Sequence, residues 1–288
     1  MTNREPDGAA KRVLTPLRVV RLVLLFIWTL CLLPVLVVAL SLGLPAARTI
    51  PLHYHRGVAR VLRLVIDTDG VPSRPGPVLF VANHSSWLDI VVLSALAPVS
   101  FVAKSEIAHW PGVSIFARLQ RTVFVVRDRR QTATSRSAIG ARLAAGDNIV
   151  LFAEGTAADG NRVLPFKTSL FAAAEDGDFS PSPLIQPVSI AYTHLNHMPL
   201  GRRARHHVAW YGRMSLGKHL WHLLGQGEVR IAVTIHPAVR ISDFASRKEL
   251  GAHCHRLVAA SHAEAISGRR LLASKVQPVV PTPSRQCS

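Results

Sequence analysis

The chain has 288 residues, of which 49% are apolar and 18% charged, and its formal net charge is +17. This composition excludes an intrinsically disordered chain, and the length allows one sizeable globular domain with an appendage. The excess of Lys and Arg favours anionic partners such as a membrane surface, phosphate-bearing substrates, acidic carrier proteins or nucleic acid. Three cysteines, Cys31, Cys254 and Cys287, have no metal-ligand spacing and form no even disulfide framework. A reducing compartment is therefore the simpler interpretation.

The N-terminal part of the sequence predicts a membrane anchor. A basic segment, residues 1–17, is expected to be disordered and precedes an almost wholly apolar stretch, residues 18–47. Between Leu22 and Leu44 there are roughly the 20 residues that a helix needs to cross the hydrocarbon core of a bilayer. The stretch is too long for the h-region of a signal peptide, and residues 44–48 make a poor cleavage site. We predict a spanning or deeply embedded membrane helix, with a buried core helix as the alternative. Basic residues flank both ends, so its orientation stays open.

Residues 48–77 predict a basic amphipathic helix followed by a connection. Basic residues alternate with apolar ones at helical spacing from His53 to Ile66, which is typical of a helix lying on anionic lipid. Packing of the same helix on the protein domain is the alternative. The segment Asp67–Pro77 is rich in Pro, Gly, Asp and Ser, which indicates a connection.

Short apolar runs alternate with helical patterns from residue 78 to residue 270. Such alternation predicts an α/β domain with a mixed, largely covered sheet and surrounding helices. The expected strands are Val78–Ala82, Ser100–Lys104, Thr122–Val126, Ile149–Ala153, Leu184–Ala191, His207–Tyr211 and Val229–His236. The expected helices lie near Trp87–Leu96, Gly112–Leu119, Gln131–Ala145, Phe166–Ala174, Leu216–Leu224 and Phe244–Ile266. Residues 271–288 are expected to be a disordered tail.

Polar side chains follow the first of these strands. An ionised carboxylate beside one imidazole nitrogen fixes the tautomer of the ring, so the other nitrogen can remove a proton from a hydroxyl or thiol. His84 is therefore a candidate general base, and Asp89 is a candidate for the group that orients it. Capping of the next helix by Asn83, Ser85 or Ser86 is the alternative. No G-x-S-x-G nucleophile elbow occurs, which favours direct attack by a substrate hydroxyl over a covalent acyl-enzyme.

A second polar cluster follows the strand predicted at Ile149–Ala153. The backbone at Gly155 can approach an anion closely, and the Thr156 hydroxyl can add a hydrogen bond. Glu154 is expected to bond substrate hydroxyls or to hold a neighbouring base. Lys167, at the start of a helical pattern, completes a candidate anion site. A capped loop with a solvated lysine is the alternative.

Two further segments contain residues that could contribute to a binding site. Arg127 ends the strand predicted at Thr122–Val126, where a guanidinium can fork onto a phosphate. Pro187 lies inside the strand predicted at Leu184–Ala191, and a proline there predicts an edge strand or the lining of a channel.

Taken in this order, the four blocks resemble the glycerophospholipid acyltransferase family, whose best-known members are of the 1-acylglycerol-3-phosphate acyltransferase type. The resemblance covers roughly residues 78 to 195. The family pattern N-H-x-x-x-x-D is matched by Asn83, His84 and Asp89, and F-P-E-G-T with its downstream F-K is matched by Phe152, Glu154, Gly155, Thr156, Phe166 and Lys167. Arg127 and Pro187 fall where the second and fourth family blocks have arginine and proline.

The sequence departs from the family pattern at several positions. Ala153 replaces the usual proline of the third block, and Gln120 lies where the second block usually has glycine. Ala157 stands where an arginine commonly follows the threonine, which weakens the expectation that the acceptor carries a simple phosphate. Residues 160–167, G-N-R-V-L-P-F-K, are also similar to lyso-ornithine lipid acyltransferases, a related bacterial branch.

The resemblance implies transfer of a fatty acyl group from acyl-CoA or acyl carrier protein to the free hydroxyl of a lysolipid, without a metal or cofactor. His84 would take the hydroxyl proton and Asp89 would orient it, while backbone N–H groups near the helix start would stabilise the oxyanion. Arg127, Lys167 and residues 154–156 would hold the acceptor. The first expected acceptor is 1-acylglycerol-3-phosphate, giving phosphatidic acid; the alternative is lyso-ornithine lipid or another lysolipid.

The implied partners are membrane lipids, the lysolipid and the acyl donor. No nucleic-acid motif occurs, so nucleic acid is not expected. An acyl-thioester donor implies an inner-membrane protein with its catalytic domain on the cytoplasmic face. A non-catalytic, membrane-tethered protein that binds anionic ligands is the alternative from another class, and hydrolysis of the thioester is a third possibility.

Overall fold

The computed structural model describes residues 8–73, 77–110, 112–125, 132–168, 171 and 183–268. These residues form an eight-stranded sheet in the order β1-β8-β6-β2-β5-β3-β4, with β7 paired to β6. β6 runs antiparallel to β7 and β8, and the other paired strands are parallel. The strands are β1 (Leu64–Asp69), β2 (Val78–Ala82), β3 (Ser100–Lys104), β4 (Val123–Val125), β5 (Ile149–Phe152), β6 (Leu184–Leu195), β7 (Met198–Pro199) and β8 (Val229–Ile235).

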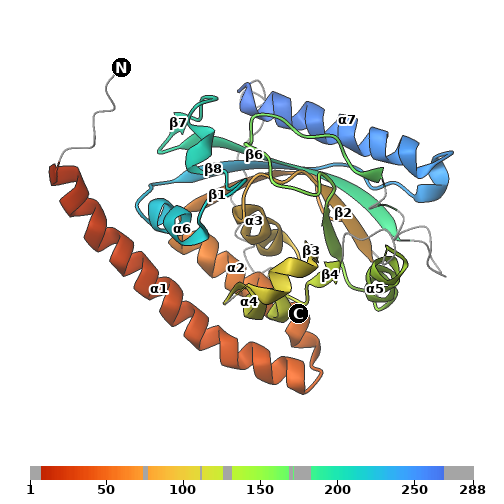
Figure 1. The fold of residues 1–288 in the computed structure, drawn as a ribbon, viewed down its shortest axis with the longest axis horizontal. Helices are drawn as coiled ribbons and strands as arrows, with labels where there is room; N and C mark the ends of the chain where they lie inside the picture. The colour runs from red at the N-terminus through yellow and green to blue at the C-terminus, as the bar shows by residue number, and fades with distance from the viewer. Residues whose placement is uncertain are drawn as a thin grey trace, which may run out of the picture.

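Helices cover both faces of the sheet (Figure 1). They are α1 (Gly8–Ser41), α2 (Ile50–Val61), α3 (Leu88–Leu96), α4 (Val113–Leu119), α5 (Thr132–Ala144), α6 (Leu216–Leu224) and α7 (Arg247–Ile266). Phe80 of β2 packs in one core with α2, α3 and α6, whereas Leu79 and Val81 pack in a second core with α5 and α7. Because successive strand residues point to opposite faces and both faces are covered, β2 is apolar throughout.

The predicted α/β fold with a mixed, covered sheet is confirmed, and one predicted strand is wrong. Residues His207–Tyr211 form no strand: the chain makes the 3-10 helix η5 (Arg205–His207) and continues irregularly. Trp210 N donates to Ser85 O at 2.8 Å, so this apolar segment bonds to the loop after β2 instead of to a strand. The helix predicted at Phe166–Ala174 falls largely outside the described residues.

The segment predicted as an amphipathic helix and a connection contributes a strand to the sheet. α2 ends at Val61 rather than at Ile66, and the chain turns through Arg63 (φ 55°) into β1, which pairs with β8. Leu52 and Val58 of α2 are buried, and Val58 packs in the core that includes α3. Of the two alternatives for this helix, packing on the domain therefore holds.

Pro187 lies in the interior of the sheet, and the expectation of an edge strand or channel lining was wrong. It pairs with Val81 of β2, and β8 lies on the other side of β6. The Pro187 carbonyl accepts from His236 N, one residue beyond the end of β8. The reciprocal bond, which the missing proline N–H cannot make to His236 O, is replaced by Gln186 Nε2, which donates to that carbonyl at 2.9 Å.

α1 contains an apolar segment, Thr15–Ser41, whose 27 residues are long enough to cross a membrane. Only 11% of its most apolar window is buried, which does not fit the alternative of a core helix. Large side chains such as Phe26 (66% exposed) and Leu30 (59% exposed) cover its outer surface. The protein therefore presents a long apolar helix surface that no described residue covers.

One side of α1 is fastened to the domain (Figure 1). Arg21 is 6% exposed and donates to the carbonyls of Leu224 and Gln226 at the C-terminal end of α6. Further along, Trp28 Nε1 donates to Tyr54 O of α2 at 2.9 Å. Since helix C-terminal carbonyls lack intrahelical partners, the Arg21 contact satisfies that of Leu224, together with the Gln226 carbonyl just beyond the helix, and fixes α1 against α6.

Gly57 allows the close contact between α1 and α2. An added Cβ would lie 2.2 Å from Trp28 Cε2, so Gly57→Ala should displace the indole and lower the thermal midpoint of unfolding by several degrees. Gly217→Ala is the matched control, because nothing lies within 4 Å of the added Cβ in α6. That control should leave the midpoint unchanged or raise it, since Ala is the better helix former. Thermal unfolding in detergent measures both, and equal midpoints for the two variants would contradict the packing.

Candidate active site

The two predicted polar clusters meet at one edge of the sheet. β2 and β5 are adjacent parallel strands, and Ala82 pairs with Phe152 at their carboxyl ends. His84 and Glu154 each follow two residues later, and His84 N donates to Glu154 Oε1 at 2.8 Å. The carboxyl ends of parallel strands are where open α/β sheets bind ligands, so this edge is the candidate active site.

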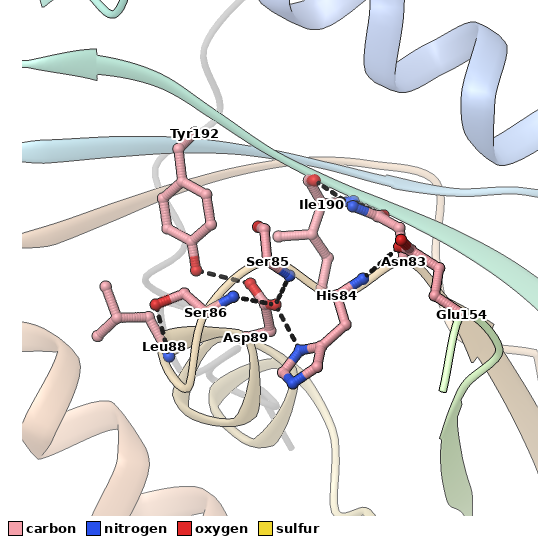
Figure 2. Close-up of polar contacts among 9 residues, drawn as sticks. All are labelled: Asn83, His84, Ser85, Ser86, Leu88, Asp89, Glu154, Ile190 and Tyr192. Carbon is pink, nitrogen blue, oxygen red and sulfur yellow. Dashed lines mark hydrogen bonds and ion pairs between the residues drawn. The ribbon is translucent and has the colours of Figure 1, made fainter. Parts of the chain in front are cut away.

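His84 and Asp89 form a hydrogen-bonded pair. His84 Nδ1 lies 2.8 Å from Asp89 Oδ2, and the two side chains are 18% and 0% exposed. A carboxylate oxygen accepts, so Nδ1 carries the ring proton and Nε2 keeps a lone pair in the neutral ring. Figure 2 shows the second ring nitrogen directed away from Asp89. His84 is thus arranged as a general base whose orientation Asp89 fixes.

Asp89 accepts several further hydrogen bonds (Figure 2). Its Oδ2 atom accepts from Ser85 N at 2.7 Å and from Ser86 N at 2.9 Å. Tyr192 Oη donates to Oδ1 at 2.6 Å. Burial, and then the negative charge of Asp89, raise the pKa of Tyr192 well above its usual value, so the phenol stays protonated and donates. These donors stabilise the ionised carboxylate without solvent.

Asn83 does not cap the next helix but bonds to a neighbouring strand. Its side-chain amide donates to Ile190 O at 2.9 Å and accepts from Ile190 N at 2.8 Å. The side chain is buried and continues the pairing of β2 with β6 one residue past the end of β2. Asn83 therefore fixes the point at which the chain leaves the sheet, directly before His84.

Glu154 ties the second loop to the first. Its two carboxylate oxygens accept from His84 N and from Leu164 N, at 2.8 Å and 3.0 Å. Burial raises the pKa of Glu154 to about 7; the two backbone bonds oppose this shift, and the nearby Asp89 charge adds to it. Of the two roles expected for Glu154, holding the base fits better than bonding substrate, because both oxygens already have protein partners.

The remaining predicted binding residues lie along the same loop. Gly155 has φ +65°, a left-handed conformation that suits glycine, and the Lys167 side chain lies against it. Lys167 N donates to Ala153 O at 2.8 Å, which brings the lysine back to the end of β5. Thr156 and Lys167 are exposed and available to an acceptor head group. Arg127 lies outside the described residues.

Sequence reasoning missed two contacts of the pair. The Phe152 ring stacks on His84 with centroids 4.0 Å apart and an interplanar angle of 18°. Tyr192 reaches Asp89 from β6, 103 positions along the chain. One feature of the sequence could have indicated the position of Tyr192. It follows Val188 and Ile190 at intervals of two residues, which is the spacing that puts strand side chains on one face of a sheet. Nothing in the sequence indicated that α3 begins beneath that face.

The expected oxyanion donors at the start of α3 are engaged. The N–H groups of His84, Ser85 and Ser86 all donate to carboxylates, and Asp89 N donates to Ser86 O. The expectation that N–H groups near the helix start stabilise an oxyanion is therefore wrong for these positions. They hold the base and its partner instead.

Comparison with known proteins identifies the family. A family model described as Acyltransferase matches residues 65–191. A lyso-ornithine lipid O-acyltransferase of Brucella abortus is 46% identical over 230 residues, which are 78% of this chain and 85% of that protein. The one of Rhizobium meliloti is 40% identical over 259 residues, covering 88% and 89%. The chain belongs to the glycerophospholipid acyltransferase family. It is an O-acyltransferase.

Two further comparisons concern the phosphatidic acid branch of the family. A 1-acyl-sn-glycerol-3-phosphate acyltransferase of Neisseria meningitidis is 39% identical over 123 residues, which are 42% of this chain and 48% of that protein. The crystal structure of the 1-acyl-sn-glycerophosphate (LPA) acyltransferase PlsC from Thermotoga maritima matches 90% of this chain and 100% of its own, with a TM-score of 0.57 and 23% identity. This likeness supports the fold.

His84→Ala should lower the rate of acyl transfer by about 10²–10⁴-fold, because it removes the group that accepts the hydroxyl proton. Asp89→Asn should lower kcat while leaving the KM of the acceptor near that of the wild type, since it disturbs the orientation of the ring and the stabilisation of the imidazolium, and Asp89 is buried. Steady-state acyl transfer by purified protein measures both. His53→Ala, at an exposed position on α2, is the matched control and should keep the wild-type rate. A folded His84→Ala variant with full activity would contradict the assignment.

Proposed function

We propose that the protein moves a fatty acyl group from acyl-CoA or acyl carrier protein to the hydroxyl of a lysolipid, and that lyso-ornithine lipid is its preferred acceptor. The observation that carries the chemistry is the 2.8 Å contact between His84 Nδ1 and the fully buried Asp89. It leaves Nε2 as the basic atom at a partly exposed edge of the sheet. The acceptor rests on the two relatives that match most of the chain.

In this proposal His84 Nε2 takes the hydroxyl proton while the acceptor oxygen attacks the thioester carbonyl. A C–O bond forms, and collapse of the tetrahedral intermediate breaks the C–S bond. The imidazolium gives its proton to the departing thiolate, which leaves as the free thiol of coenzyme A or the carrier protein, and His84 returns to its neutral form. Asp89 stabilises that imidazolium, and proton transfer of this kind is worth about 10²–10⁴-fold in rate. The chemistry requires neither a metal nor a cofactor.

The chain's own departures from the family pattern support the choice of acceptor. Ala157 occupies the position at which arginine commonly follows the threonine, so the loop lacks one cation for a phosphate monoester. Lyso-ornithine lipid carries an amino-acid head group and no phosphate. The alternative, 1-acylglycerol-3-phosphate, is favoured by the shorter Neisseria match and by Lys167, whose ammonium group lies against Gly155. We therefore rank lyso-ornithine lipid first.

The exposed apolar surface of α1 supports attachment to the membrane in which both lipid substrate and product reside. The contacts of Arg21 and Trp28 fasten this helix along the domain, so membrane binding would hold the active-site edge near the lipid phase. Acyl-CoA and acyl carrier protein are cytoplasmic donors. We accordingly assign the domain to the cytoplasmic face of the inner membrane.

The test is a competition between acceptors. Purified full-length protein receives labelled acyl-CoA or acyl carrier protein with an equimolar mixture of lyso-ornithine lipid and lysophosphatidic acid, and mass spectrometry identifies the products. Diacylated ornithine lipid should dominate, and His84→Ala should form neither product. A larger yield of phosphatidic acid would contradict the acceptor. Free fatty acid as the main product would indicate hydrolysis, and no product at all would favour a binding protein.

A further inference from the structure

A cationic pocket lies at the edge of the sheet opposite to His84. Asp147 and Asn148 precede β5, whereas Glu154 follows it, so the length of β5 separates the pocket from the candidate active site. The cavity measures about 70 Å³ and is lined in part by Arg48 and Arg121. That volume would hold several water molecules, and it is enough for one phosphate group.

Three arginines share one carboxylate in this pocket. Asp147 Oδ2 lies 2.7 Å from Arg142 Nε and 2.8 Å from Arg121 Nη2, and Oδ1 lies 3.3 Å from Arg48 Nε. Asp147 is 4% exposed, but the three arginine side chains are 23–49% exposed. In the parts of the chain that the structure describes, Asp147 is the carboxylate paired with these groups, so the cluster carries an excess of two positive charges. Burial, and then the charge of Arg142, lower the pKa of Arg121, whereas Asp147 opposes this shift.

An uncommon backbone conformation and a buried neighbouring side chain hold Arg121 in place. Its φ of 59° lies in the left-handed region, which few residues other than glycine adopt. The preceding Gln120, which stands where the family usually has glycine, donates its amide to Ser94 Oγ at 3.0 Å and to Val99 O at 2.9 Å. Gln120 is buried and also lines the pocket. This departure from the family pattern thus builds one wall of the cationic pocket.

Exposed apolar side chains precede the pocket on two of the chain segments that line it. Leu42 and Leu44, at the end of α1, are 66% and 44% exposed and lead directly to Arg48. Ile115 and Phe116 of α4 are 57% and 46% exposed and lead to Gln120 and Arg121. A soluble anion would need only the arginines. A phospholipid would use both the cations and the adjoining apolar surface.

We propose that this pocket binds the phosphate group of an anionic membrane phospholipid, whose acyl chains lie along the exposed apolar residues at the end of α1. Guanidinium groups fork onto phosphate oxygens, and basic pockets beside membrane helices recognise lipid head groups in this way. The bound lipid is neither substrate nor product. It fixes the end of α1 on the bilayer and thereby sets how the opposite edge, with His84, faces the membrane.

Flotation of the purified full-length protein tests the proposal with two kinds of vesicle, pure phosphatidylcholine and phosphatidylcholine containing phosphatidylglycerol. Arg48→Gln and Arg121→Gln should each weaken binding to the anionic vesicles roughly fivefold and leave binding to neutral vesicles unchanged. Arg60→Gln removes the same charge from an exposed position about 14 Å further along α2 than Pro51, a pocket-lining residue, and should behave as the wild type. Equal losses in all three variants would overturn the proposal, because they would reflect general surface charge.

Asp147→Asn should change the binding to anionic vesicles in the direction opposite to that of the arginine variants. Removal of the shared carboxylate raises the excess charge of the cluster, so binding to anionic vesicles should tighten. Weaker binding by folded Asp147→Asn would show that the arginines serve only to hold the loops together, and it would overturn the proposal. Arg48→Gln remains informative if Asp147→Asn does not fold, because it leaves Asp147 with two arginine partners. A thermal shift with inorganic phosphate that Arg48→Gln abolishes, without any change in vesicle binding, would indicate a site for free phosphate and would also overturn it.

Discussion

The buried carboxylate of Asp89 is the interaction on which the candidate active site depends. An ionised carboxylate that is removed from water costs several kcal/mol unless hydrogen bonds replace its hydration. Asp89 is fully buried and accepts from His84, from the backbone N–H groups of Ser85 and Ser86, and from the Tyr192 phenol. Because the charge is tolerated only with these donors in place, the loop after β2 has one conformation and the imidazole one orientation.

The sheet brings these groups together. β2 lies between β5 and β6, so its carboxyl end receives the Glu154 loop from one neighbour and the Tyr192 side chain from the other. Asn83 locks the β6 side through Ile190, and Glu154 locks the β5 side through His84 N. The position of the base is therefore set by strand order rather than by local sequence. The N–H groups of Ser85 and Ser86, just before α3, accordingly serve Asp89 rather than a developing oxyanion.

Local patterns in the sequence were sufficient for most of the strands, the covered sheet and the His84–Asp89 spacing, because each depends on residues within a few positions of one another. They did not find β1, and they predicted a strand at residues 207–211 that does not form. They were insufficient wherever a partner comes from a distant strand. Asn83 has the residue type of a helix cap, and its actual partner, Ile190, is 107 positions away. Tyr192 lies one residue beyond the strand predicted at Leu184–Ala191 and received no role, since its contact requires β6 beside β2. Both cases need the strand order, which short-range periodicity does not contain.

Nitrogen-15 NMR of histidine-labelled protein tests the central claim most directly, because it reports which ring nitrogen of His84 carries the proton. At alkaline pH the neutral ring should carry its proton on Nδ1, facing Asp89. Comparison with His84→Ala assigns the signal. The preference for Nδ1–H should be lost in Asp89→Asn. A wild-type ring with its proton on Nε2 would contradict the account, because the nitrogen that faces the acceptor would then have no lone pair to receive the hydroxyl proton.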